Sequence, residues 1–114
     1  MKELETQICV IAAGPSGLAA ACQAAEDGAE VIVLEKAASV GGAANMGMGP
    51  LGIGTKYQKE QMIGISVEKA FNMFMEYTHY NVDARMVKRY FDQSAETIEW
   101  LEDMGVAAHC RRSW

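Results

Sequence analysis

The chain lacks any long apolar run, any stripe of basic residues and any paired cysteine motif. No stretch approaches the ~20 consecutive apolar residues of a membrane-spanning helix. Ten Lys and Arg residues are dispersed among fifteen Asp and Glu residues, which leaves a net charge of −5. An acidic surface without a basic stripe repels phosphate backbones and anionic lipid. We therefore expect no nucleic-acid partner and no direct insertion into a membrane.

Cysteine and histidine are too few and too scattered for a disulfide framework or a metal site. The three cysteines form no C-x-x-C pair, and His79 and His109 have no ligand-type spacing around them. Cys9 falls in an expected strand and Cys22 in an expected helix, where we predict small buried side chains. The first six residues carry carboxylates and lead directly into an apolar run, unlike a signal peptide. These features predict a cytoplasmic location and no metal ion.

Two apolar runs are present, separated by a turn of small residues and an alanine-rich segment. Half of the 114 residues are hydrophobic, so the chain is globular, but its length allows at most one small domain. The expected elements are a strand over residues 7–12, a helix over 15–27 that stops at Gly28, and a strand over 30–34. A carboxylate, Glu35, follows the second strand directly.

The turn reads Ala12-Ala13-Gly14-Pro15-Ser16-Gly17, a G-x-G-x-x-G fingerprint whose first glycine is replaced by Ala12. Small side chains let the backbone approach a pyrophosphate, and a helix N-terminus offers it unpaired N–H groups. Ala12 fits if its φ stays negative, or if strain of roughly 1 kcal/mol is accepted. Glu35 stands where a carboxylate can accept from two ribose hydroxyls. The pattern indicates a Rossmann-like βαβ dinucleotide-binding unit in an α/β fold, with an ordinary α/β glycine turn as the alternative.

A glycine-rich loop follows instead of a prompt second helix. Residues 41–54 contain six glycines, so the backbone there can lie close to a large flat cofactor. The loop also carries apolar side chains that a solvated linker would not favour, at Met46, Met48, Leu51 and Ile53. A flexible surface loop remains the alternative interpretation.

The turn, the pair Glu35-Lys36 and the run Val40-Gly41-Gly42 together resemble the N-terminus of the FAD-dependent fumarate reductase and succinate dehydrogenase flavoprotein family. The resemblance covers residues 8–106 and is sharpest over 8–54. It implies that Glu35 holds the adenosine ribose, that the turn lines the pyrophosphate, and that the loop passes along the flavin. The implied cofactor-binding residues are Ala12, Ala13, Gly14, Pro15, Ser16, Gly17, Glu35, Lys36, Gly41, Gly42, Ala43 and Gly49.

Two departures from that family bear on the cofactor. Family members often have Asn-Ser or Asn-Thr after the glycine pair, where this chain has Ala43-Ala44, so side-chain bonds to the cofactor are lost there. Covalent members attach FAD through a histidine in this loop, and none lies between Gly41 and Gly54. The resemblance therefore implies non-covalent FAD.

The resemblance further implies hydride transfer between flavin and a C=C or CH–CH bond of a carboxylate-like small-molecule substrate. It also implies a redox partner subunit for the full-length protein. No residue of this chain is assigned a catalytic role, because the substrate-binding groups are expected in later segments. We predict an FAD-binding unit over 1–54, a helical segment over 55–106 and a tail over 107–114, together an incomplete domain. The competing hypothesis is a stand-alone nucleotide-binding or interaction module without catalysis.

The helical segment shows capping and periodicity signals. We predict a short helix over 57–63, then helices over 66–80, 83–92 and 94–104, begun by Ser66, Asp83 and Ser94 and closed by Gly105. The methionine and aromatic side chains on the apolar faces are expected to form core. The acidic side chains near the end of the last helix are expected to face solvent; they are Glu96, Glu99, Glu102 and Asp103.

Overall fold

The computed structural model describes residues 3–47 and 49–106. The chain is an α/β protein with a small parallel sheet, and it divides into two compact units, Met1–Gly49 and Pro50–Trp114. Each unit is described by itself. Within the described residues, no helix combines the length and the apolar character needed to cross a bilayer.

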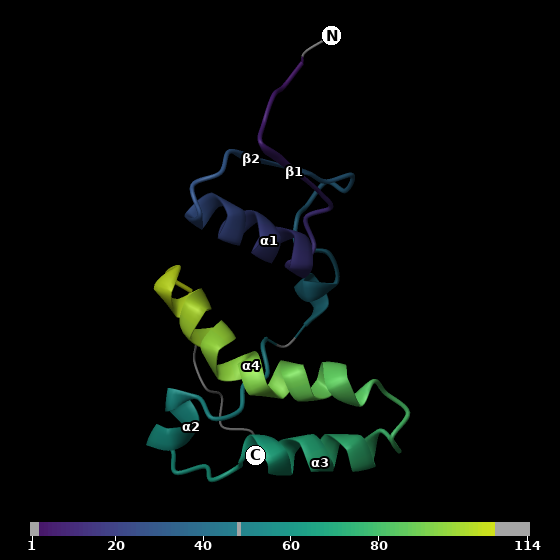
Figure 1. Cartoon of the computed structure of the whole chain (residues 1–114), viewed down its shortest axis with the longest axis vertical. Coiled ribbons are helices and arrows are strands. Elements are labelled where there is room, and N and C mark those ends of the chain that lie inside the picture. The colour runs from purple at the N-terminus through teal and green to yellow at the C-terminus, as the bar shows by residue number, and fades with distance from the viewer. Residues whose placement is uncertain (1–2, 48, 107–114) are drawn as a thin grey trace. The chain divides into compact units, whose positions relative to one another are not determined.

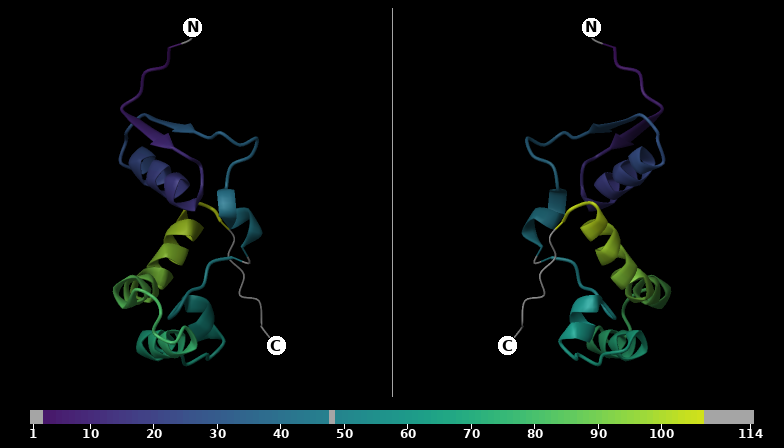
Figure 2. Two further views of the ribbon diagram at one scale, coloured as in Figure 1. Left: turned by 90° about the vertical axis from the view of Figure 1, so that its right-hand side faces the viewer. Right: turned by 90° about the vertical axis from the view of Figure 1, so that its left-hand side faces the viewer.

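The first unit is built from two strands, a helix and a 3₁₀ helix. In order, they are β1 (Ile8–Ile11), α1 (Pro15–Glu26), β2 (Val31–Leu34) and η1 (Gly42–Met46). The strands pair in parallel, with Ile8 opposite Val31 and Ile11 opposite Leu34. α1 packs along one face of the two-stranded sheet (Figures 1 and 2). The predicted strands and helix are confirmed to within a residue at each end, whereas η1 was not predicted.

The end of α1 follows the predicted glycine stop. Gly28 adopts a left-handed φ of +89°, a conformation that costs a residue with a Cβ far more than it costs glycine. The N–H of Gly28 donates to Ala25 O and that of Ala29 to Ala24 O, both at 3.0 Å. These two bonds are the Schellman pattern, and they satisfy carbonyls that the helix leaves without internal partners.

The prediction that Cys9 and Cys22 are buried is wrong, because both are exposed. Cys9 lies on a two-stranded sheet that also exposes Ile11, at 81 %, and Leu34, at 51 %. Within the described residues, α1 is the helix that packs on this sheet, so one helix covers one sheet face. Cys22 lies on an exposed side of α1, next to the buried Ala21.

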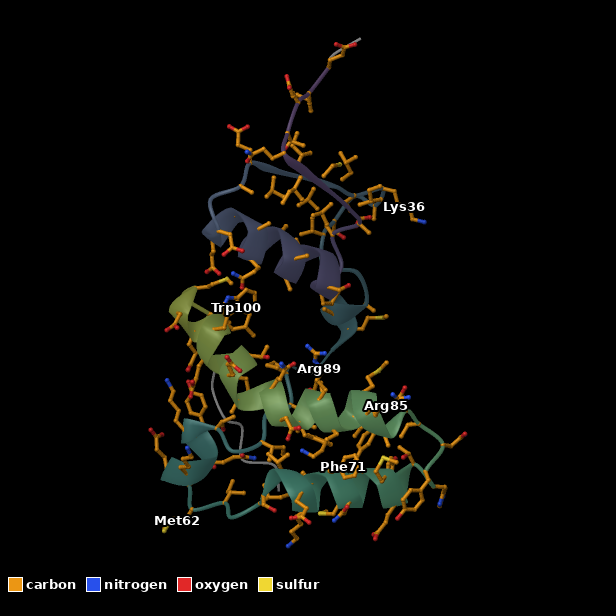
Figure 3. All side chains as sticks on the ribbon, viewed as in Figure 1. Lys36, Met62, Phe71, Arg85, Arg89 and Trp100 are labelled. Carbon is orange, nitrogen blue, oxygen red and sulfur yellow. The ribbon has the colours of Figure 1, made fainter. Side chains whose placement is uncertain are left out.

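The second unit contains three helices, α2 (Lys56–Glu60), α3 (Val67–Tyr77) and α4 (Ala84–Asp103). α3 and α4 lie side by side, as the views in Figures 1 and 2 agree. Phe71 points from α3 toward α4 (Figure 3) and packs against the buried core, but the prediction that the methionine and aromatic side chains form core is only partly right, because Tyr77 is 83 % exposed and Met86 72 %. Met62 is also exposed, at 91 %, and points away from the helices of its unit. The core cluster is Ile53, Ala70 and Phe91, with Ile65, Val67, Phe71 and Val87 packed around it.

The helix starts at Ser66 and Asp83 are confirmed. The Ser66 hydroxyl accepts from Lys69 N at 3.1 Å, and the Asp83 carboxylate accepts from Arg85 N at 2.8 Å. Each bond satisfies an N–H group that has no acceptor inside its helix. α3 ends at Tyr77, three residues earlier than predicted, because His79 and Tyr80 both take left-handed backbone conformations.

The predicted helix break at Ser94 is wrong, because α4 runs unbroken through this position. Ser94 is buried, and its hydroxyl donates to Phe91 O at 3.0 Å within the helix while it accepts from Ile53 N at 2.9 Å. A serine hydroxyl bonded to the preceding turn is compatible with a continuing helix. The expected inward position of Ile98 and the stop at Gly105, with φ +90°, are confirmed.

The prediction that Glu102 faces solvent is wrong, because its side chain joins α4 to α2. Its carboxylate lies 2.8 Å from Lys56 Nζ and accepts from the Tyr57 hydroxyl, and its side chain is 16 % exposed. The hydrogen bond from Lys56, followed by that from Tyr57, lowers the pKa of the Glu102 carboxyl. α2 spans only five residues, too short to persist as an isolated helix, so this contact helps to hold it.

Candidate functional site

The turn from β1 into α1 is held in a conformation unusual for alanine. Ala12 has φ +84°, and its N–H donates to Leu34 O at 2.7 Å, which continues the pairing of the two strands. Of the two possibilities open from the sequence, the turn therefore takes the strained one. Ala13, directly after it, is 1 % exposed.

Replacing Ala12 with glycine is expected to stabilise the protein. The left-handed conformation costs an L-residue about 1 kcal/mol more than it costs glycine, so Ala12→Gly should raise the free energy of unfolding by about that amount. Denaturant unfolding of both proteins measures the difference. Ala13→Gly is the control, since no left-handed φ is recorded there. An Ala12→Gly protein no more stable than the parent would contradict the strain argument.

The two glycines of the turn have different structural roles. A Cβ built on Gly17 would lie 2.0 Å from the carbonyl oxygen of Ala12, so α1 can approach the turn only with glycine there. A Cβ on Gly14 would have no atom within 4 Å, and the φ of Gly14 is an ordinary −78°. Packing of the chain on itself thus requires Gly17, whereas the space beside Gly14 is open to a ligand.

The N-terminus of α1 is suited to an anion. Gly14 is its N-cap residue and offers no side-chain cap, and Pro15 occupies the first turn. The first hydrogen bond of the helix runs from Leu18 N to Gly14 O, at 2.9 Å. The N–H groups of Ser16 and Gly17 precede that bond and have no acceptor within the helix. No acidic residue lies in this first turn to compete with an incoming phosphate.

Glu35 is fixed beside the turn by backbone hydrogen bonds. Its Oε2 accepts from Ala13 N and its Oε1 from Ala37 N, each at 2.8 Å. These bonds, that from Ala37 first, lower the pKa of the Glu35 carboxyl, so the group is an anion at neutral pH. A carboxylate oxygen has about two acceptor positions, so each oxygen can still accept from a ligand hydroxyl. Lys36 is exposed, and its side chain extends away from the sheet (Figure 3).

The glycine-rich loop begins on the same turn. Gly41, with φ +105°, donates from its N–H to Ala13 O at 2.7 Å. A Cβ on Gly42 would lie 3.3 Å from Gly14 Cα, so the loop and the turn are in close contact. Asn45 then closes the loop on itself by donating from Nδ2 to Val40 O at 2.9 Å.

Ala13 is the residue at which these parts meet, because its N–H donates to Glu35 and its C=O accepts from Gly41. The structure therefore brings together the turn, the carboxylate and the start of the loop. Ala43 lies exposed in η1, and Gly49, with φ +105°, takes no part in these bonds. The sequence did not single out Ala37, whose contribution is a backbone N–H that no side-chain pattern signals.

The comparisons with known proteins agree with this geometry. Residues 7–113 match a family described as FAD binding domain. The chain is 39% identical over 99 residues to the vinyl phenol reductase of Lactiplantibacillus plantarum, covering 87% of this chain and 20% of that protein. It is 31% identical over 102 residues to the NADH:fumarate oxidoreductase of Klebsiella pneumoniae, covering 87% of this chain and 11% of that protein.

Two solved structures share the fold. The open conformation of a flavocytochrome c3 fumarate reductase matches with a TM-score of 0.78 and 33% identity, covering 88% of this chain and 18% of that one. A 3-ketosteroid-Δ4-(5α)-dehydrogenase from Rhodococcus jostii RHA1, in complex with 4-androstene-3,17-dione, matches with a TM-score of 0.80 and 33% identity, covering 94% of this chain and 23% of that one.

The chain spans a fifth or less of the length of these two curated relatives, 20% of one and 11% of the other. The residues present fit the adenosine diphosphate part of FAD: an uncapped helix N-terminus, open space beside Gly14 and an oriented carboxylate at Glu35. The family model covers most of the chain, and the relatives are reductases. This chain belongs to the FAD binding domain family of flavoprotein oxidoreductases, and its cofactor is FAD.

Proposed function

We propose that this chain is the FAD-binding N-terminal portion of an oxidoreductase of the fumarate reductase and succinate dehydrogenase type, with a Rossmann-like βαβ unit at its centre. The observation that carries the proposal is the double role of Ala13, which joins Glu35 to the glycine-rich loop. To bind one FAD, a chain must bring together a group that binds the ribose, a turn that binds the pyrophosphate and a loop that lies along the flavin. Ala13 supplies that convergence through its backbone alone.

Each part of the site has a proposed role in holding FAD. Glu35 accepts from the adenosine ribose hydroxyls with the acceptor positions that Ala13 and Ala37 leave free. The N–H groups of Ser16 and Gly17 bind the pyrophosphate. The loop from Gly41 through Ala43 to Gly49 lies along the flavin, where its glycines allow close backbone approach. Lys36 completes the site at the adenosine end.

When bound, FAD supplies hydride exchange with a C=C or CH–CH bond beside a carboxylate. The residues of this chain bind and orient; the groups that hold substrate and move its proton are proposed to lie outside it. A small-molecule substrate and a redox partner subunit belong to the whole protein, in line with the reductases that resemble it. We propose the cytoplasm as its compartment, and the division at residues 54 and 106 stays a prediction.

Bound FAD is expected to be non-covalent, because no histidine lies between Gly41 and Gly54. The purified protein should be yellow, and acid precipitation should release all of its flavin into the supernatant. Absorbance of both fractions near the flavin maximum measures the partition. Flavin retained on the denatured polypeptide would contradict non-covalent binding. A colourless protein that binds ADP but not FAD would favour the stand-alone nucleotide-binding module.

The chain by itself is expected to show no reductase turnover. The site described is proposed to bind the adenosine diphosphate part of FAD. None of its residues is a histidine or an arginine that could hold a carboxylate substrate. Reduction of fumarate by a reduced viologen dye, with added FAD, measures the activity. A flavoprotein fumarate reductase under the same conditions is the positive control. Clear turnover by the isolated chain would place the catalytic groups within it, contrary to the proposal.

A further inference from the structure

Three residues at four-residue spacing form a stripe on α4: Tyr90, Ser94 and Ile98. Residues four apart lie above one another on a helix, so the three share one face. We call this set the α4 stripe. Ser94 and Ile98 are buried, at 5 % and 8 % exposure, and Tyr90 is 49 % exposed.

The α4 stripe holds the last part of the glycine-rich loop, residues 51–53. The Tyr90 hydroxyl donates to Leu51 O at 3.0 Å, and the Ser94 hydroxyl accepts from Ile53 N at 2.9 Å. Both bonds link residues about forty positions apart, 39 and 41, so neither is a local turn contact. The Ser94 hydroxyl donates its proton to Phe91 O, and this orients the lone pairs of Ser94 Oγ to accept from Ile53 N.

Gly52 lies between the residues that make these two bonds, and its backbone packs against Ile98, the third member of the stripe. A Cβ on Gly52 would lie 2.2 Å from Ile98 Cδ1 and 2.7 Å from Thr55 Cγ2. The loop therefore meets α4 at its backbone, without a side chain between them. Three consecutive loop residues, Leu51, Gly52 and Ile53, thus contact three successive positions of one helix face.

We propose that the α4 stripe anchors residues 51–53, the last part of the glycine-rich loop. Tyr90 and Ser94 are then positioning residues for the flavin part of FAD. This inference rests on the proposed function. The proximal end of the loop is held by Gly41 on Ala13. Glycine has the largest backbone entropy to lose on ordering, and holding residues 51–53 on α4 removes part of that cost before the ligand arrives.

The anchor predicts a selective effect on binding. Glu35 and the α1 N-terminus, which are proposed to bind the adenosine diphosphate part, make no hydrogen bond to Tyr90 or Ser94 among those found in the described residues. Loss of the anchor should therefore weaken the binding of FAD and leave the binding of ADP unchanged. A general loss of fold would weaken both ligands together.

The first test measures the loop without cofactor. Amide hydrogen exchange in the purified full-length apoprotein compares Ser94→Ala, Tyr90→Phe and Thr97→Ala with the parent. Thr97 is the matched control: its hydroxyl bonds to Gln93 O within α4, at 2.9 Å, and is exposed. We expect amide exchange over residues 49–54 to be faster in Ser94→Ala and Tyr90→Phe than in the parent. Exchange in α1 should be unchanged, and Thr97→Ala should behave like the parent. Unchanged exchange in the loop would overturn the anchor.

The second test titrates the same proteins with FAD and with ADP. Removing one hydrogen bond worth about 1 kcal/mol corresponds to about a fivefold change in an equilibrium, so Ser94→Ala, which removes a buried bond, should weaken FAD binding about fivefold, and Tyr90→Phe, which removes an exposed one, by no more than that. ADP affinity should stay at the parental value, and Thr97→Ala should change neither. Equal losses for both ligands, or no loss for FAD, would overturn the positioning role. A parent protein that binds no FAD would instead overturn the proposed function.

Discussion

Gly17→Ala is expected to destabilise the protein by about 1–3 kcal/mol and to abolish FAD binding. The added methyl would lie 2.0 Å from the carbonyl oxygen of Ala12, and a backbone atom cannot rotate away as the end of a side chain can. Relief requires α1 to move off the turn, which displaces the N–H groups proposed to bind the pyrophosphate. Denaturant unfolding measures the first effect, and flavin titration the second.

Gly14→Ala is the matched control for that experiment. Its φ of −78° suits alanine, and a Cβ there meets no atom within 4 Å, so the free energy of unfolding should be unchanged. FAD binding should still weaken, because the methyl points into the space beside the helix N-terminus. The two variants thus distinguish Gly17, which the packing of α1 requires, from Gly14, which leaves space for the ligand. Equal stability of the Gly17→Ala protein and its parent would refute this distinction.

Glu35→Ala is expected to weaken FAD binding by about 1–3 kcal/mol, the range for a hydrogen bond to a charged group. The carboxylate is oriented by Ala13 and Ala37 before any ligand binds, so its loss removes an acceptor already in place. Glu30→Ala is the control, since it removes the same charge from an exposed side chain of the same unit. FAD affinity equal to that of the parent would reject Glu35 as the ribose ligand.

The pH dependence of this contact has a definite sign. Backbone N–H groups lower the pKa of Glu35 in the folded protein, so folding favours its ionised form. The stabilisation is then fully present above the ordinary carboxyl pKa and is lost as the pH falls through the lowered folded value. The part of the FAD affinity that depends on Glu35 should therefore be constant with pH near neutrality, where the carboxylate stays ionised, and should fall only in acid as Glu35 is protonated; FAD titrations at a series of pH values, with Glu35→Ala as the reference, measure this.

The first unit was predictable because its signals are local. The apolar runs, the glycine stop at Gly28 and the small-residue turn each specify nearby backbone, and the observed elements follow them. The helix caps at Ser66 and Asp83 were predictable for the same reason, since each bonds an N–H two or three residues away. Glu35 could be placed at the end of its strand from order alone.

What the sequence could not predict depends on distant partners. Ser94 resembles a helix start until its hydroxyl is seen bonded to Ile53, 41 residues away. Glu102 resembles a solvated charge until Lys56 and Tyr57 are seen against it. The exposure of Cys9 follows from how many elements cover the sheet, which the composition of one strand cannot reveal. The orientation of Glu35 depends on backbone N–H groups, which every residue except proline carries.

The contact of Glu102 with α2 makes the order of that helix depend on protonation. The pKa of the Glu102 carboxyl is lowered and that of the Lys56 ammonium is raised, each chiefly by their mutual hydrogen bond. Above the ordinary carboxyl pKa the pair holds α2 against α4; as the pH falls through the lowered value, the contact is lost. Five residues cannot propagate a helix unaided, so α2 is expected to be less firmly held in acid, although its Thr55 cap does not titrate. The protection of the Lys56–Glu60 amides against hydrogen exchange should therefore decrease as the pH falls, which makes α2 a local reporter of the charge on Glu102.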